Sequence, residues 1–344
     1  MKKIKVFCGY TNTAGVAYTI AEGLRRNGIK ADSVVISEHE FSFPYHKKIW
    51  FASSGRTFIN RLLKYFYFIK HVLSYNVFIF NSRSTLLSRK LDLLILKLLG
   101  KKTAMIYTGC DIRDKNYYLN SEEKYTICKN CTDSYQKKLN CVMDIKLKET
   151  HKIQKYIHAS FAHPFDAMIL NGKFNYYYVP LELEKYEPVY NLNKRIKIVH
   201  SPSDDGVKGT KYVIEAIEKL REEGIDFEFE LIRNKPNYYV INTIKNSDIV
   251  IDQVVLGYYA LLSIEAMALG KTVVCYIKDK LYDYLPDIPI VNLNPDNLAE
   301  GLKGLITDRN KLISYGKLGR AFVEKYHDYK KISAQMIKII INSN

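Results

Sequence analysis

The sequence has no uninterrupted apolar run of the roughly 18 residues that a membrane-spanning helix needs, and the leucine-rich stretch 91–99 is cut by Asp92 and Lys97. The first apolar run begins after two lysines but stops at Gly9, so we interpret it as a buried strand rather than a secretion signal. No Gly-x-Gly-x-x-Gly motif follows that strand, so a bound dinucleotide is not indicated. These absences predict a protein that is soluble or peripheral to a membrane.

Cysteine is scarce, with six in 344 residues. Without a secretion signal, this number indicates a reducing compartment rather than a disulfide framework. Cys128-Lys-Asn-Cys131 has the spacing that places two thiolates on one metal ion, and Cys141 and Cys110 would complete four sulfur ligands. The sequence leaves two alternatives open: a structural zinc site, or reduced cysteines in a loop insertion.

Composition indicates two domains and a polyanionic partner. A chain of 344 residues with 47% hydrophobic residues can build two cores of ordinary domain size. The 52 Lys and Arg against 36 Asp and Glu give a net charge of +16. Such a charge favours nucleic acid, an anionic membrane or phosphorylated ligands, and does not choose among them.

Strands and helices alternate along most of the chain, which predicts an α/β fold of two doubly wound domains. We expect a first domain over 1–185 with a cysteine-containing insertion at about 114–157, a second domain over 186–328, and a terminal helix over 329–344 that crosses back to the first domain. Two further helices, 56–75 and 86–102, combine basic with aromatic or leucine side chains. They are either core helices with a solvated basic face or helices that lie on an anionic bilayer.

One stretch, 248–277, has the pattern of a strand, a loop, a helix, a tight turn and a strand. Its loop at Gly257 precedes the helix, where free backbone N–H groups and the helix dipole favour an anion. Glu265 lies further along the helix, as a carboxylate for sugar hydroxyls or as an ordinary surface glutamate. Lys208-Gly209-Thr210 after the strand at 196–200 is a second candidate for phosphate binding.

The run Glu265-Ala-Met-Ala-Leu-Gly-Lys-Thr-Val-Val resembles the donor-binding segment of the retaining glycosyltransferases of the large group-1 family, relatives of glycogen synthase and sucrose synthase. This resemblance implies a GT-B architecture, in which two Rossmann-like domains face a cleft. Three departures stand out: Gly257 replaces the first glutamate of the family motif, Thr108 replaces a cleft histidine, and no arginine shortly precedes Lys208.

The resemblance implies a glycosyltransferase that moves a sugar from a nucleotide-diphosphate sugar to a glycan or lipid-linked acceptor, with retention, in cell-surface polysaccharide or lipopolysaccharide synthesis. It assigns catalytic roles to Lys208, Glu265 and Asp111. Substrate contacts are expected at Ala14, Gly15, Thr108, Gly109, Arg113, Ser201, Ser203, Gly209, Arg233, Gly257, Tyr258, Tyr259, Ala260 and Leu261.

We expect no cofactor to be required for the chemistry, since Lys208 and helix-start amides can neutralise the leaving diphosphate. The expected location is cytoplasmic, including the inner face of the plasma membrane, and no nucleic-acid partner is expected. Two alternatives remain: a nucleic-acid-binding protein with a zinc knuckle formed by Cys110, Cys128, Cys131 and Cys141, and a non-catalytic GT-B scaffold.

Overall fold

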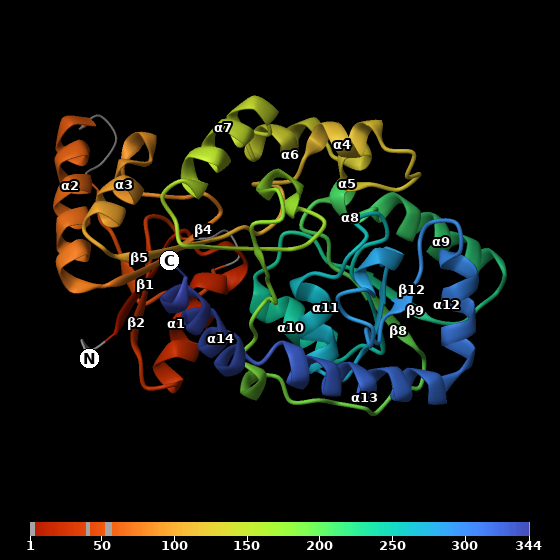
Figure 1. Ribbon diagram of the computed structural model, residues 1–344. Helices are drawn as coiled ribbons and strands as arrows, with labels where there is room; N and C mark the ends of the chain where they lie inside the picture. The colour runs from red at the N-terminus through yellow and green to blue at the C-terminus, as the bar shows by residue number, and fades with distance from the viewer. Residues whose placement is uncertain (1–3, 39–41, 52–56, 344) are drawn as a thin grey trace. The chain divides into compact units, whose positions relative to one another are not determined.

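The computed structural model describes residues 4–38, 42–51 and 57–343 (Figure 1). The chain divides into two compact units. The first contains Met1–Asp114, Cys141–Pro180 and Tyr329–Asn344, and the second contains Lys115–Asn140 and Leu181–Asp328. Each unit is built on its own parallel β-sheet.

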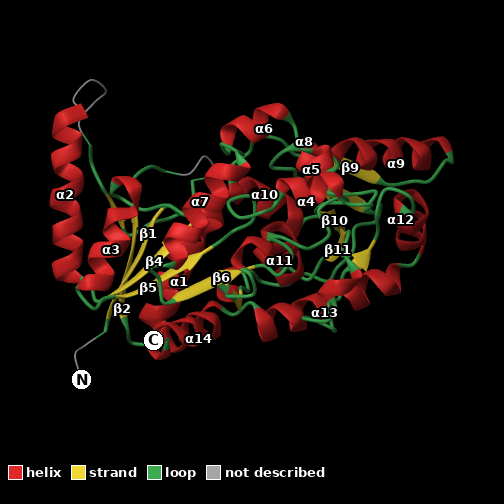
Figure 2. Cartoon of the chain, turned by 45° about the horizontal axis from the view of Figure 1, so that its top comes forward, coloured by secondary structure: helices red, strands yellow, loops and turns green. Residues whose placement is uncertain are grey.

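The sheet of the first unit has the strand order β3-β2-β1-β4-β5-β6-β7, and every pairing is parallel. Valine, isoleucine and phenylalanine dominate its central strands, as expected where both faces are covered by helices (Figure 2). The strands are β1 (Lys5–Tyr10), β2 (Lys30–Val35), β3 (Lys47–Lys48), β4 (Val77–Asn81), β5 (Lys102–Ile106), β6 (Ala159–Ala162) and β7 (Asn175–Tyr176).

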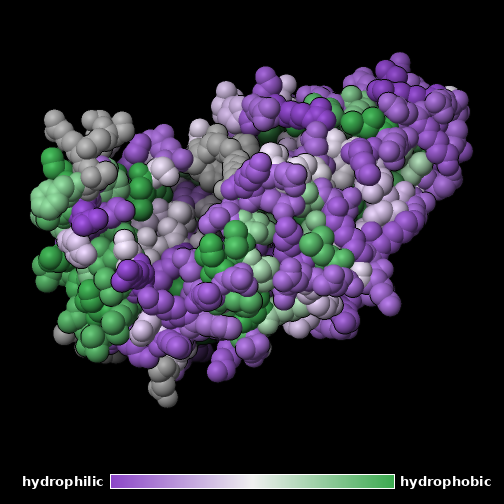
Figure 3. Space-filling model, turned by 90° about the horizontal axis from the view of Figure 1, so that it is seen from above, coloured by the Kyte–Doolittle hydropathy of each residue, from purple (hydrophilic) through white to green (hydrophobic). Residues whose placement is uncertain are grey.

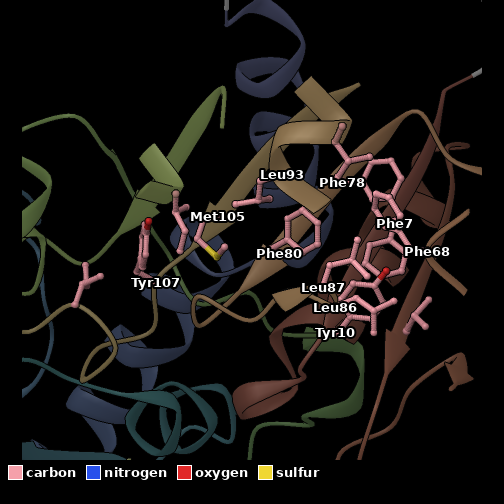
Figure 4. Packing of buried hydrophobic residues seen from close by; sticks show 14 of the residues in the cluster. Phe7, Tyr10, Phe68, Phe78, Phe80, Leu86, Leu87, Leu93, Met105 and Tyr107 are labelled. Atoms are coloured by element: carbon pink, nitrogen blue, oxygen red, sulfur yellow. The ribbon is translucent and has the colours of Figure 1, made fainter. Parts of the chain in front are cut away.

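Helices cover both faces of this sheet. On one face, α1 (Val16–Arg26) and α14 (Tyr329–Asn342) pack together, and only a glycine fits at position 23, where a Cβ would meet Ser333 and the Tyr329 backbone. On the other face, α2 (Thr57–Ser74), α3 (Leu91–Leu98) and α7 (Met143–Gln154) cover a core rich in aromatic rings (Figure 4). The carboxyl-terminal helix therefore completes the first core.

The sheet of the second unit has the order β12-β11-β10-β8-β9 and is also parallel throughout. Its strands are β8 (Lys197–His200), β9 (Glu228–Leu231), β10 (Ile249–Ile251), β11 (Thr272–Cys275) and β12 (Val291–Asn292). Its helices are α4 (Lys115–Asn120), α5 (Ile127–Asn130), α6 (Asp133–Lys138), α8 (Asp205–Lys208), α9 (Thr210–Glu222), α10 (Asn237–Lys245), α11 (Leu261–Ala268), α12 (Leu298–Thr307) and α13 (Arg309–Tyr326).

Single turns of 3-10 helix complete the structure, at Thr13–Gly15, Ser88–Lys90, Ala167–Leu170, Leu183–Lys185 and Asp279–Leu281. In the second unit, α9 and α12 bury leucine, isoleucine and valine side chains against one face of the sheet. Within the described part of the chain, no helix is both long and apolar enough to cross a membrane.

The two parallel sheets confirm the predicted α/β class with two Rossmann-like domains. The position of the insertion differs from the prediction. Residues 115–140 belong to the second unit, although the sequence suggests that all of 114–157 belongs to the first. The reason is a set of long-range polar contacts, such as the ion pair of Glu123 with Lys278 and the hydrogen bonds of Lys124 and Tyr125 to Asp296.

Candidate functional site

Lys208 and Asp252 form a buried ion pair at the carboxyl edge of the second sheet. Lys208 ends α8, which follows β8, and Asp252 directly follows β10. Because β8 and β10 are adjacent parallel strands, the segments that follow them meet at the same edge. The Lys208 ammonium therefore lies in the loop region where α/β proteins of this architecture hold their ligands.

Asp252 also organises the start of α11. Its Oδ2 accepts hydrogen bonds from the Ser263 hydroxyl at 2.6 Å and from the Ala260 backbone N–H at 3.2 Å. Burial by itself would raise the pKa of Asp252, but the Lys208 charge and these hydrogen bonds together lower it. An anionic group thus occupies the helix start, as the helix dipole favours, and it belongs to the protein itself.

Two further buried side chains fix this edge. His200 joins the Ile251 carbonyl at 2.8 Å to the Thr210 hydroxyl at 3.0 Å, and burial lowers its pKa to about 4, so the ring is neutral at pH 7. Gln253 accepts from the N–H groups of Val255 and Leu256 and donates to the Tyr258 carbonyl. The loop before α11 is therefore held in shape by internal hydrogen bonds.

Glu265 is buried on α11. Its Oε1 accepts hydrogen bonds from the Tyr186 hydroxyl and from the Asn237 side-chain amide, each at 3.1 Å. Burial raises the pKa of this carboxyl to about 7, although both hydrogen bonds oppose the shift. The interpretation of Glu265 as an ordinary surface glutamate is therefore wrong.

Two glycines allow close approach at this edge. Gly209 has φ +73°, and a Cβ there would lie 2.7 Å from a methyl group of Val254. Gly257 has φ +91°, and a Cβ there would meet the side-chain stem of Lys278. Both positions require the left-handed conformation that glycine adopts without strain.

The other predicted contacts of the second unit lie on the same loops. Ser201 and Ser203 follow β8, with Ser203 exposed, and Ala260 and Leu261 are partly exposed at the start of α11. Tyr258 and Tyr259 are buried, and the Tyr259 hydroxyl bonds to His327 at 3.0 Å. The two tyrosine side chains are therefore part of the packing of this unit.

In the first unit, three hydroxyl groups connect the loops after β1, β4 and β5. Ser82 lies 3.0 Å from the Thr13 hydroxyl and 2.9 Å from the Thr108 hydroxyl. The Asp111 carboxylate accepts from the Thr108 and Gly109 N–H groups. Burial raises the pKa of Asp111 to about 6, and the nearby charge of Arg83 opposes the shift.

Four residues near this edge have φ values in the left-handed region. They are Ala14 at 53°, Gly15 at 72°, Ser82 at 52° and Arg83 at 56°. Non-glycine residues in this conformation cost about 1–3 kcal/mol each and concentrate at functional sites. Five predicted positions thus lie on loops at one edge of the first sheet: Ala14, Gly15, Thr108, Gly109 and Asp111.

Two predicted arginine contacts have other partners. The Arg113 guanidinium is buried and pairs with both carboxylate oxygens of Asp166, at 2.6 and 3.2 Å, so it is a structural ion pair rather than a substrate contact. Arg233, just past the end of β9, is exposed to solvent and pairs with Asp205 at 2.8 Å.

The four predicted cysteine ligands are divided between the two units. Cys110 accepts from Arg113, Cys141 accepts from Lys146, and Cys128 and Cys131 lie in the second unit. Among the described residues, no group of three or more His, Cys, Asp and Glu side chains has an arrangement that could hold a metal ion. A cavity of about 560 Å³ in the second unit, lined by Arg195, Lys197, Arg221 and Glu228 among others, shares no residue with the predicted site.

Sequence reasoning missed Asp252, Ser263 and Ser82. Asp252 and Ser82 each follow a buried strand directly, so the rule that ligands bind at the carboxyl ends of parallel strands could have identified them. Ser263 lies in the first turn of α11, within the stretch 248–277 that contains the family motif.

No protein-family model matches this sequence, and no curated protein matches it. Solved structures do match it over almost its whole length. Sucrose-phosphate synthase from Thermosynechococcus elongatus aligns with 98% of this chain and 97% of its own, with TM-score 0.63 and 15% identity. An alpha-glucosyltransferase in complex with UDP and a 13-mer DNA aligns over 98% and 99%, with TM-score 0.59 and 12% identity.

WaaG, a glycosyltransferase involved in lipopolysaccharide biosynthesis, aligns over 99% of this chain and 100% of its own, with TM-score 0.53 and 13% identity. A UDP-N-acetylglucosamine 2-epimerase from Listeria monocytogenes aligns over 98% and 96%, with TM-score 0.55 and 11% identity. At these identities the alignments establish the fold. The chain shares the GT-B fold with these structures, which is the fold that the resemblance at Glu265 implies.

Proposed function

We propose that this protein is a nucleotide-sugar-dependent glycosyltransferase that binds its donor in the second unit and transfers the sugar to a glycan or lipid-linked acceptor. The observation that carries the proposal is the cluster of Lys208, Asp252 and Ser263 at the start of α11, at the carboxyl edge of a parallel sheet. Parallel α/β sheets bind nucleotides at this edge. One solved structure with this fold, an alpha-glucosyltransferase, is a complex with UDP.

In the proposal, Asp252 holds Lys208 in place until the donor binds. A donor diphosphate carries negative charge that competes with the Asp252 carboxylate for the ammonium group. The developing charge on the leaving diphosphate then falls beside a lysine and near a helix start, which is how enzymes stabilise such a leaving group. This step requires no metal ion if the lysine and the amides carry the charge.

Glu265 is proposed to bind a hydroxyl group of the donor. Both hydrogen bonds that hold its carboxylate end on Oε1, from Tyr186 and Asn237. Within the described part of the chain, no hydrogen bond ends on Oε2, so this oxygen can accept one from a ligand. Oε1 is held by the protein and Oε2 is available to a ligand, which suits a residue that orients a ribose or sugar.

The transfer breaks the bond between the sugar anomeric carbon and the diphosphate oxygen, and forms a bond from that carbon to an acceptor oxygen. The acceptor hydroxyl loses its proton, and the diphosphate that departs takes this proton up. Asp111, with its pKa raised to about 6, is our candidate in the first unit for contact with the acceptor. Retention of anomeric configuration is part of the proposal because the family resemblance implies it.

The lipopolysaccharide role of WaaG supports, as a further part of the proposal, an acceptor in cell-surface polysaccharide or lipopolysaccharide synthesis and a location at the cytoplasmic side of the membrane. One structure that shares this fold was solved with a 13-mer DNA, but it is an alpha-glucosyltransferase in complex with UDP, so its DNA contact does not favour the nucleic-acid-binding alternative over glycosyl transfer.

A thermal-shift screen with UDP, GDP and their sugars tests donor binding, since a ligand that binds the native state raises the apparent stability. We expect one nucleotide class to stabilise the wild type, and Glu265→Gln to weaken this effect. Glu215→Gln, an exposed change on α9, is the matched control. If no nucleotide stabilises the wild type, the proposed donor site is refuted.

A second experiment separates transferase from epimerase chemistry. The stabilising nucleotide sugar is incubated with and without a pool of membrane glycolipids or oligosaccharides. Release of nucleotide diphosphate that requires the acceptor supports glycosyl transfer. A changed sugar configuration without any acceptor supports the epimerase instead, and a gel shift at physiological salt tests the nucleic-acid alternative.

A further inference from the structure

Helix α2 exposes a continuous stripe of large apolar side chains. The stripe follows helical spacing of i, i+4, i+8, i+11 and i+15 along one face. It consists of Phe58 (69% exposed), Leu62 (54%), Phe66 (60%), Ile69 (58%) and Leu73 (81%). Figure 3 shows hydrophobic side chains gathered at the end of the first unit where α2 lies in Figure 1.

The opposite face of α2 packs against the protein core. Phe68, His71 and Tyr75 are buried against β1 and β4, and the Phe7 ring lies 5.0 Å from His71 and 5.7 Å from Tyr75. The Lys101 ammonium donates to the Val72 and Tyr75 carbonyls at the end of the helix. The helix is thus firmly packed on one side, and the exposed stripe is additional apolar surface.

Positive charge surrounds the stripe, with no acidic side chain on the helix. The sequence has no Asp or Glu between Glu40 and Asp92. Arg61 and Lys70 are exposed on α2 and Lys64 is partly exposed. Among the described residues no carboxylate pairs with any of the three. Burial lowers the pKa of His71 to about 4, so this ring adds no charge near neutral pH.

Neighbouring segments extend the same surface. Trp50, the single tryptophan of the chain, is 69% exposed, and the ring of the next residue, Phe51, contacts Tyr67 of α2 at 6.4 Å. At the end of α3, Leu98 and Leu99 are exposed just before Lys101, which bonds to α2. Amphipathic rings such as tryptophan favour the boundary between water and lipid.

We propose that the α2 stripe, with Trp50, binds the surface of an anionic lipid bilayer. A helix with an apolar face and flanking cations lies in the plane of the interface, with its apolar side chains among the acyl chains and its cations at the phosphates. A second copy of this chain is a poorer occupant, because it would place like charges opposite each other. Like the other described helices, α2 is not long and apolar enough to cross a bilayer.

The sequence allows two interpretations of helix 56–75: a core helix with a solvated basic face, or a helix that lies on a bilayer. The exposed stripe favours the second interpretation. Arg56 lies outside the described residues. This inference is independent of the proposed function, because vesicle binding does not require a donor, an acceptor or turnover. The vesicle-binding proposal can therefore fail while the glycosyltransferase proposal stands, and the glycosyltransferase proposal can fail while vesicle binding stands.

Vesicle flotation with the full-length protein tests the proposal. We expect binding to vesicles of phosphatidylcholine with about one third phosphatidylglycerol, weaker binding to pure phosphatidylcholine, and loss of part of the binding at high salt. Leu62→Ser with Ile69→Ser should abolish flotation, and Arg61→Gln with Lys70→Gln should weaken it about fivefold for each charge removed. Lys317→Gln with Leu318→Ser, an exposed pair on α13, should bind like the wild type.

Intrinsic fluorescence gives a second measurement, because the single Trp50 reports on this surface alone. Anionic vesicles should shift its emission to shorter wavelength, and brominated acyl chains should quench it. Unchanged emission together with equal, negligible flotation on both vesicle types would overturn the proposal. So would light scattering that shows a dimer in the wild type and a monomer in Leu62→Ser with Ile69→Ser, without vesicle binding.

Discussion

The side-chain stem of Lys278 lies where a side chain at position 257 would begin. A Cβ at Gly257 would be 2.5 Å from Cε and 2.6 Å from Cγ of this lysine. The Lys278 ammonium pairs with Glu123 and lies 4.8 Å from the centre of the Tyr118 ring. The position that carries a glutamate in the resembled family is therefore filled here by a lysine from another loop.

Gly257→Ala should destabilise the protein more than a change at an open glycine. The φ of +91° costs a non-glycine residue about 1–3 kcal/mol, and the contact with Lys278 adds to this. Gly224→Ala is the control, since Gly224 has φ +73° with no heavy atom near its Cβ position. Denaturant unfolding measures both, and equal losses of unfolding free energy would contradict the close packing of Lys278.

Lys208→Met should lower the free energy of unfolding by about 3–5 kcal/mol, because it leaves the buried Asp252 carboxylate without its partner. Adding Asp252→Asn should restore part of the stability, since the buried charge is then gone. Lys211→Met, an exposed change one turn along, is the control.

Nucleotide binding distinguishes this structural role from the proposed one. The double change Lys208→Met with Asp252→Asn keeps a folded protein but lacks the ammonium group. We expect it to lose stabilisation by nucleotide diphosphates in the thermal-shift assay. Unaltered nucleotide affinity in this folded variant would remove Lys208 from the donor site.

The sequence alone predicts the two parallel sheets because their central strands are short β-branched runs, such as 249–251 and 272–275, between helical segments. It also places Lys208 and Glu265, through a local motif. Local patterns cannot show the docking of residues 115–140 on the second unit, which depends on the pairing of Glu123 with Lys278, 155 residues away. Nor can they distinguish the inner from the outer apolar face of α2.

Arg113→Ala should destabilise the first unit without a specific effect on substrate. Asp166 is buried and accepts both hydrogen bonds from the guanidinium, so removal of the arginine costs about 3–5 kcal/mol. Arg113→Ala with Asp166→Ala should be less destabilised than the sum of the single changes. Thermal unfolding measures the cycle, and a stable Arg113→Ala protein with impaired acceptor binding would restore the sequence prediction.

The stability of the protein should depend on pH through Glu265. Its folded pKa of about 7 exceeds the ordinary value of 4.5, so between these values the folded state holds more protons than the unfolded state. Stability contributed by this group is therefore present below about pH 4.5 and is lost as the pH rises through 7, on the order of 3 kcal/mol. Glu265→Gln keeps an oxygen that accepts from Tyr186 and Asn237 but cannot ionise. The unfolding free energy of the variant minus that of the wild type should therefore be larger at pH 8 than at pH 5.5. Glu215→Gln is the control. An identical difference at both pH values would show that the Glu265 carboxylate is not buried as described.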